Sequence, residues 1–136
     1  MSEFAIKIRE HILIAHSLPD PAFGRAEGMH GATYIVHVTF FRERLSEKNI
    51  IVNIGLAREV VKAVLAPLNY QNLDEKPDLK GKLTTTEFLC KHIFDQICDV
   101  IADGMLGEDG KALSRLRVTL QESHVARVWY EGPLPK

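Results

Sequence analysis

Two apolar, β-branched segments flank a stretch crowded with Pro and Gly, and this arrangement constrains the fold most. Residues 4–16 begin with strict alternation of apolar and polar side chains and continue as an apolar run, which is typical of a strand with one buried face. Residues 32–42 are rich in β-branched and aromatic side chains and favour a second strand. Because residues 17–31 contain two prolines and three glycines, we expect a long irregular loop that joins the strands as a large hairpin. A loop of this length is itself a candidate site.

A short strand and a helix are expected next. The apolar run at residues 49–54 predicts a third strand. Apolar side chains then recur at helical spacing over residues 55–66, and Asn53 stands before them as a plausible N-cap. Residues 69–83 are polar and irregular. We therefore expect a helix over 55–66 followed by a loop.

The clearest helical pattern follows Thr84 and continues to Ile101. Thr84 and Glu87 have the spacing of a capping box, in which each side chain satisfies a free backbone N–H at the other end of the first turn. Cys90 and Cys98 lie about two turns apart in this helix, too far for a mutual disulfide. The two cysteines are therefore expected to be core thiols of a reducing compartment.

The last third of the chain predicts two further strands. Residues 104–111 interrupt the chain, and residues 116–120 and 126–130 alternate as strands. The fold class is therefore α+β, with an antiparallel four-stranded sheet and two helices on one face, in a single domain over residues 1–136. Such a sheet exposes unpaired strand edges, so we expect an oligomer that closes them into a β-barrel.

Composition excludes several classes of partner. Apolar residues make up 46% and charged residues 26% of the chain, the ordinary balance of a folded domain. Seventeen Lys and Arg against 18 Asp and Glu give a net charge of -1, so we expect neither nucleic acid nor a membrane as partner. The start of the chain lacks the pattern of a signal peptide and no run is long enough to span a bilayer. We expect a cytoplasmic protein.

Six motifs, taken in order, resemble the 6-pyruvoyl-tetrahydropterin synthase and 6-carboxy-tetrahydropterin synthase family. They are Ile14-Ala15-His16, Met29-His30-Gly31-Ala32-Thr33-Tyr34, Val52-Asn53-Ile54-Gly55, Leu68-Asn69-Tyr70-Gln71-Asn72-Leu73, Thr85-Thr86-Glu87 and Val118-Thr119-Leu120-Gln121-Glu122. The resemblance covers about residues 4–132. It implies a tunnelling fold, in which subunits join their sheets into a barrel, commonly as a hexamer of two trimers with sites between subunits.

The metal site implied by this resemblance is incomplete. The family holds zinc with three histidines, and this chain matches two of them with His16 and His30 but has Ala32 at the third position. Catalytic zinc needs about three protein ligands and an open position. His37 and His11 cannot substitute on a regular strand, because their parity places them on the opposite face. We therefore expect no cofactor and no zinc.

The catalytic set implied by the resemblance is altered as well. Ala26 stands where the family has its cysteine nucleophile, and Asn69 and Tyr70 stand where it has an Asp-His pair. Asn cannot take a proton, and a Tyr with a pKa near ~10 is a poor base at neutral pH. We expect that this chain has no catalytic residue at the family positions and does not perform the synthase reaction.

The ligand anchor is retained. Glu122 matches the carboxylate that anchors the pterin in the family, and its two oxygens can accept from the ring N–H and amine of a 2-amino-4-oxo pyrimidine. Thr85 and Thr86 match threonines of the same pocket. The resemblance thus implies a homo-oligomer that binds a pterin-like ligand at a subunit interface. Helix capping alone also accounts for the two threonines, and a solvated turn residue accounts for Glu122.

Two other functions stay open. An enzyme of the same family with altered catalytic residues, a lyase acting on dihydroneopterin triphosphate or a related pterin, could use Glu27, Tyr70 and His124. His124 is expected to share the strand face of Glu122. A structural subunit that assembles with another protein is the third hypothesis. Whichever function holds, His16 and His30 are expected to be ordinary, partly buried histidines rather than metal ligands.

Overall fold

The computed structural model of the chain describes residues 2–135. The elements in chain order are β1 (Phe4–His16), the 3₁₀ helix η1 (Pro21–Glu27), β2 (His30–Arg42), α1 (Ile54–Leu65), β3 (Gln71–Asn72), the 3₁₀ helix η2 (Leu73–Glu75), α2 (Thr86–Ala102), α3 (Gly107–Lys111), β4 (Arg115–Ser123) and β5 (Ala126–Pro133).

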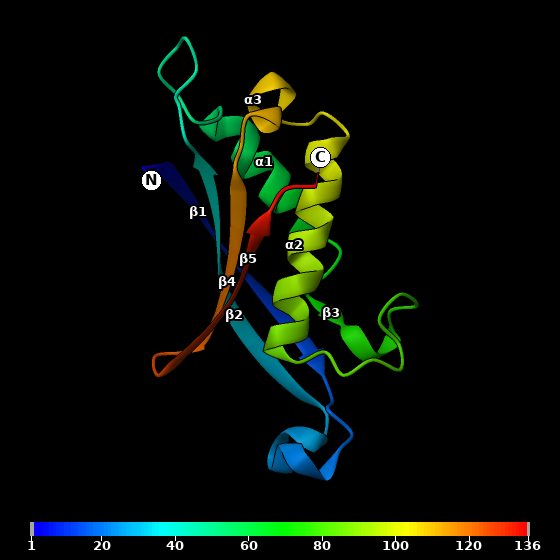
Figure 1. The fold of residues 1–136 in the computed structure, drawn as a ribbon. Coiled ribbons are helices and arrows are strands. Elements are labelled where there is room, and N and C mark those ends of the chain that lie inside the picture. The colour runs from blue at the N-terminus through cyan, green and yellow to red at the C-terminus, as the bar shows by residue number, and fades with distance from the viewer. Residues whose placement is uncertain (1, 136) are drawn as a thin grey trace.

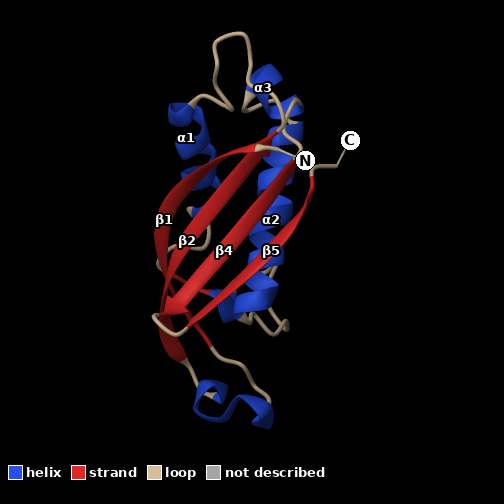
Figure 2. Cartoon of the chain, turned by 60° about the vertical axis from the view of Figure 1, so that its left-hand side comes forward, coloured by secondary structure: helices blue, strands red, loops and turns tan. Residues whose placement is uncertain are grey.

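The strands form one five-stranded sheet in the order β3-β1-β2-β4-β5. The long strands β1, β2, β4 and β5 pair antiparallel, whereas the two-residue β3 runs parallel to β1. The helices α1 and α2 lie on one face of the sheet (Figure 1), and the other face carries no helix (Figure 2). The predicted α+β fold with helices on one face is confirmed.

The β1–β2 hairpin fixes which side chains face the helices. Its register is unbroken from Phe4 opposite Arg42 to His16 opposite His30. Because side chains alternate along a strand, the even-numbered residues of both strands share one face. That face is buried from Ile8 onward and packs against the helices, while the odd-numbered face of β1 is mostly exposed.

The core lies between the sheet and the helices. Its central members come from β2, α1, α2 and β4, and they include Val38, Val61, Ile93 and Val118, each 0% exposed. Burial of such side chains removes apolar area from water and contributes roughly 1.5–3 kcal/mol for each fully buried residue. Amphipathic helices 55–66 and 84–101 were both predicted from this pattern, and the structure confirms them with small differences at their ends.

Helix α1 begins as the sequence predicts. The Oδ1 of Asn53 accepts from the backbone N–H of Leu56 at 3.0 Å, which is the N-cap bond expected of this residue. The thiols Cys90 and Cys98 of α2 are both free and buried.

The predicted strand at residues 49–54 is wrong. This segment begins with a tight turn, in which Ser46 and Ile50 share a backbone hydrogen bond and Asn49 takes a left-handed conformation with φ of 61°. A left-handed residue interrupts an extended strand. The short strand that joins the sheet is instead β3, which the sequence did not predict because its two residues carry no periodic pattern.

Three predicted irregular stretches contain short helices, one of them η2 within residues 69–83. Within residues 17–31, η1 forms because the Asp20 carboxylate accepts from the Ala22 N–H at 2.9 Å and Pro21 suits the first helical position. The strand β2 also begins at His30, two residues earlier than predicted. Within residues 104–111, the last five form α3.

Both long edges of the sheet are largely open. The outer edge of β1 pairs only at Ile14 and Ala15, with β3, and β5 has β4 on one side alone. The sheet of a single chain is therefore not closed. Across residues 2–135, every helix is too short or too polar to cross a bilayer.

Candidate functional site

A cavity of about 210 Å³ lies where the far end of the hairpin, the start of α2 and the end of β4 meet. It is lined by His16, Leu18, Phe23, Ala26, His30, Tyr34, Thr85, Thr86, Glu87 and Glu122. The structure therefore brings together the retained residues of the resemblance, although they lie far apart in the sequence. Apolar side chains come from the η1 segment and polar ones from the strands and α2.

The two histidines occupy opposite positions at the end of the hairpin. His16 ends β1 and His30 begins β2, and their rings meet edge to face with centroids 4.6 Å apart. His16 is buried, and its Nδ1 shares a hydrogen bond of 3.0 Å with the Thr84 hydroxyl. The Nδ1 of His30 lies 2.8 Å from the carbonyl oxygen of Gly28, so it donates to that oxygen.

The environment of His16 favours its neutral form. Burial lowers the pKa of His16 below its ordinary value of 6.5, and the nearby His30 lowers it further. The backbone of Thr84 and the carboxylates of Asp74 and Glu122 oppose this shift but do not cancel it. At neutral pH the ring therefore presents one N–H and one unprotonated nitrogen.

Thr85, not Thr84, caps helix α2. The Thr85 hydroxyl accepts from the Phe88 N–H at 3.1 Å, so the predicted capping box of Thr84 and Glu87 does not form. The helix starts one residue later because Thr84 is drawn inward, where it is 1% exposed, to meet His16. The first N–H groups of a helix lack intrahelical partners, so this helix start adds donors to the cavity wall.

Glu122 reaches the cavity at an irregularity of the sheet. The pairing of β4 with β5 shifts register between Gln121 and Ser123, which leaves Glu122 as the extra residue of a β-bulge. Its negative charge acts on both His16 and Tyr34. A carboxylate beside free helix donors suits a planar ligand that offers N–H groups to the carboxylate and acceptor atoms to the helix start.

Tyr34 is a cavity residue that the sequence analysis did not single out. It is 1% exposed, its hydroxyl lies 3.3 Å from that of Thr86, and burial raises its pKa above 10.0. Its position four residues along β2 from His30 was the available signal, because residues of equal parity share a face. Phe23 and Leu18 carried no such signal, since their loop has no periodic pattern.

The residues present fit zinc poorly. Within residues 2–135 there is no group of three or more His, Cys, Asp or Glu side chains placed to hold a metal ion. The third family position is the buried methyl group of Ala32. His16 and His30 each use one ring nitrogen in a hydrogen bond within the protein, which leaves two nitrogens and no third ligand. No chemical step of this site is therefore assigned to a metal.

Asn69 and Tyr70 lie outside the cavity and bind the edge of β1. The Asn69 Oδ1 accepts from the Leu13 N–H at 2.9 Å, and the Tyr70 N–H donates to the Leu13 carbonyl at 2.6 Å. Tyr70 has a left-handed φ of 59° and its side chain is 77% exposed. It borders a separate hollow with Ile14 and Gln71. Within one chain, these residues attach β3 to β1.

The remaining candidates do not line the cavity. His11 and His37 lie on the face without helices, as their parity predicts. Glu27 is exposed beside Ala26. His124 does not share a strand face with Glu122, because β4 ends at Ser123 and residue 124 lies in the turn.

An open, mainly antiparallel sheet with helices on one face and a polar cavity at the end of its long hairpin defines a protein of the tunnelling-fold class. Solved structures support this class at low sequence identity. The Caenorhabditis elegans 6-pyruvoyl tetrahydropterin synthase has a TM-score of 0.80 at 18% identity, with 97% of each chain covered. The enzyme of Plasmodium vivax has a TM-score of 0.77 at 16% identity, with 98% of this chain and 99% of that chain covered.

The family follows from sequence. The model of the family described as 6-pyruvoyl tetrahydropterin synthase matches residues 5–133, so this chain belongs to that family. A 6-pyruvoyl tetrahydrobiopterin synthase of Dictyostelium discoideum is 31% identical over 83 residues, which cover 60% of this chain and 62% of the relative. The match thus spans less than two thirds of that relative's length. A further structure of the P. vivax protein, at 15% identity and a TM-score of 0.76 over 98% of this chain and 99% of that one, carries alanine in place of a glutamate that is called a catalytic residue.

Proposed function

We propose that this protein binds a pterin-like ligand, a 2-amino-4-oxo bicycle, in the cavity around Glu122. The observation that carries the proposal is the meeting of Glu122, Thr85 and Thr86 in one cavity of a chain of this family. The carboxylate would accept two parallel hydrogen bonds from the ring N–H and the amine of the ligand. The threonine hydroxyls and the start of α2 would meet the remaining polar edge.

The family's synthase reaction is absent in this proposal. Ala26 has no group that can act as nucleophile or proton carrier, and within one chain Asn69 and Tyr70 lie at the edge of β1, outside the cavity. The two histidines offer too few ligands for catalytic zinc. Binding without the family's turnover accounts for a retained anchor beside altered chemical groups.

The proposed assembly is a homo-oligomer, a hexamer of two trimers, with the ligand at a subunit interface. The open edges of β1 and β5 support it, since pairing them between subunits would satisfy their free backbone groups. Glu122 is exposed in the single chain, so a neighbouring subunit could cover the bound ligand.

The first experiment is a fluorescence titration with neopterin and biopterin. Wild type should bind saturably, and Glu122→Gln should bind at least about tenfold more weakly, because hydrogen bonds to a charged group contribute about 1.5–3 kcal/mol. The matched control is Glu87→Gln, which neutralises the other glutamate of the cavity and should leave affinity within about threefold of wild type. Equal binding by Glu122→Gln and wild type would reject the anchor.

The alternative is a lyase that acts on dihydroneopterin triphosphate or a related pterin with altered catalytic residues. A catalytic glutamate named in the P. vivax protein motivates this alternative, because Glu27 directly follows Ala26, which lines the cavity. Wild type incubated with dihydroneopterin triphosphate should give no new product by mass analysis. A product that disappears in Glu27→Gln would establish the enzyme instead.

A further inference from the structure

The face of the sheet without helices is ordered into rows that cross four strands. Strand pairing sets Arg9, His37, Thr119 and Trp129 in one row. The row beside it on one side holds Lys7, Thr39, Arg117 and Glu131, and the row on the other side holds His11, Ile35, Gln121 and Arg127. All these side chains have the parity that points away from α1 and α2.

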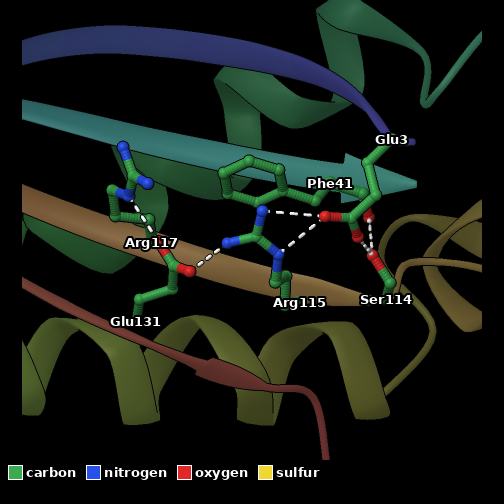
Figure 3. Close-up of polar contacts among 6 residues, drawn as sticks. All are labelled: Glu3, Phe41, Ser114, Arg115, Arg117 and Glu131. Atoms are coloured by element: carbon green, nitrogen blue, oxygen red, sulfur yellow. Dashed lines mark hydrogen bonds and ion pairs between the residues drawn. The ribbon is translucent and has the colours of Figure 1, made fainter. Parts of the chain in front are cut away.

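At one end of this face the positive charges are neutralised. The Arg115 guanidinium lies between Glu3 and Glu131, with its Nε 2.9 Å from the Glu3 Oε1 (Figure 3). The Nε of Arg117 lies 2.5 Å from the Glu131 Oε1. Arg115 also stacks on the Phe41 ring, 3.7 Å from its centroid. At this end of the face, Arg115 and Arg117 therefore already have acidic partners within the chain.

The centre of the face has cations without acidic partners. We call this set the cationic cluster; its members are Lys7, Arg9, His37 and Arg127. None of the ion pairs found among residues 2–135 includes Lys7, Arg9 or Arg127, and these three side chains are exposed. The positive charges of Lys7, Arg9 and Arg127 all act on His37. Partial burial lowers the pKa of His37 most, and these three charges lower it further.

Two further side chains of the face suit a phosphorylated ligand. The Oγ1 of Thr39 is buried and has no hydrogen-bond partner among the described residues, and it lies between Lys7 and Arg117 in its row. A buried hydroxyl without a partner is uncommon, and an anion beside it would accept a hydrogen bond from it. Trp129, the chain's one tryptophan, is 61% exposed in the row of Arg9 and offers a ring face for stacking.

We propose that the cationic cluster is a binding site for a polyphosphate chain. The cluster extends over about three strand spacings, roughly 14 Å, so it suits an extended anion with several charges. Positive groups that lack counter-charges repel one another. A bound anion relieves this repulsion, so its electrostatic binding energy is most favourable at such a cluster. The site lies on the opposite face of the sheet from the Glu122 cavity and does not rest on the pterin proposal.

Two sources of this chemistry have to be separated. One is inorganic polyphosphate, and the other is the phosphate tail of a nucleotide whose base stacks on Trp129. Titration with sodium tripolyphosphate and with ATP at constant ionic strength distinguishes them. Both probes should bind if the phosphate groups supply most of the affinity. If the adenine base stacks on Trp129, Trp129→Leu should weaken the binding of ATP but not that of tripolyphosphate.

The deciding variant is Arg9→Gln with Arg127→Gln, read by calorimetry with tripolyphosphate. It should lose at least about tenfold in affinity, because two charge-assisted hydrogen bonds are removed. The control is Arg58→Gln with Lys62→Gln, which removes the same charge from exposed positions of α1 and should bind like wild type. If both double variants bound tripolyphosphate equally weakly, the loss would come from net charge alone, and the proposed site would be rejected.

Folding and specificity complete the test. Circular dichroism and thermal melting show whether the double variant is folded; if it is not, Lys7→Gln alone should weaken tripolyphosphate severalfold while neopterin binding is unchanged. No saturable binding of tripolyphosphate by wild type would overturn the proposal. Neopterin and biopterin carry no phosphate and test only the Glu122 cavity, whereas tripolyphosphate tests only the cationic cluster. Either proposal can therefore fail while the other holds.

Discussion

Thr84 and Thr85 are adjacent and have the same side chain, yet they have different tasks. Thr85 caps α2, and Thr84 is buried against His16, its partner 68 residues earlier. The sequence could predict that a helix starts here and that Thr85, Thr86 and Glu122 belong to one pocket. It could not predict which threonine caps the helix, because the choice depends on a tertiary contact.

The buried ring of His16 makes stability depend on pH. The fold lowers the pKa of His16 below 6.5, so below that pH the unfolded chain binds a proton more readily than the folded one. Stability is therefore fully present above about pH 6.5 and falls as the pH drops towards the folded-state pKa, by at most about 1.4 kcal/mol per pH unit for one proton. Urea unfolding between pH 7.5 and 5.5 measures this slope.

The variant His16→Gln should reduce that slope, because it removes the titrating group. The control is His11→Gln, an exposed histidine of the opposite face on the same strand. The expectation would be contradicted if both variants changed the slope equally. His37 and His92 also have lowered pKa values, mainly through burial, and they maintain part of the slope in either variant.

At the scale of elements, long periodic segments were predictable and short ones were not. The strands β1 and β2 and the helices α1 and α2 are long enough for the spacing of their apolar residues to predict them. The two-residue β3 depends on Asn69 and Tyr70 bonding to Leu13, and no local pattern announces such contacts. The apolar run at 49–54 does not form a strand, because the left-handed backbone of Asn49 turns the chain before it can pair with a neighbouring strand.

The start of α2 gives a direct test of helix capping. Thr85→Ala should lower the free energy of unfolding by about 1 kcal/mol, because the Phe88 N–H loses its acceptor. Thr85→Ser keeps the hydroxyl and should recover most of this loss, and chemical denaturation compares the two. If Glu87→Ala destabilised the protein as much as Thr85→Ala, Glu87 would have a capping role that the structure does not give it.

At the scale of the whole molecule, the open edges of the sheet determine how copies can meet. Phe4, at the start of the free edge of β1, is 49% exposed and borders an apolar hollow of about 560 Å³ together with Ile6 and Ile54. An exposed apolar edge strand favours pairing with another chain. The sequence predicted the edges, but it did not predict this hollow, which arises from the turn at Asn49.

The mass in solution tests the proposed assembly. Light scattering should give six times the chain mass of 15.3 kDa, or three times that mass if the trimers separate. Phe4→Glu should lower the mass at equal concentration, because a charged side chain at a strand edge opposes pairing. Met105→Glu changes a residue of similar exposure, 44%, away from the sheet edges, and it should leave the mass unchanged. A monomer for wild type would reject the assembly.

The unbroken β1–β2 register also determines when the cavity forms during synthesis. Nearby strands pair at a lower entropic cost than distant ones, so the hairpin can close once residue 42 has left the ribosome. His16 and His30 then already stand opposite each other. Glu122 arrives only when β4 has been synthesised and has paired with β2, well after the hairpin has closed. A nascent chain released early would therefore carry the histidine half of the cavity without its carboxylate.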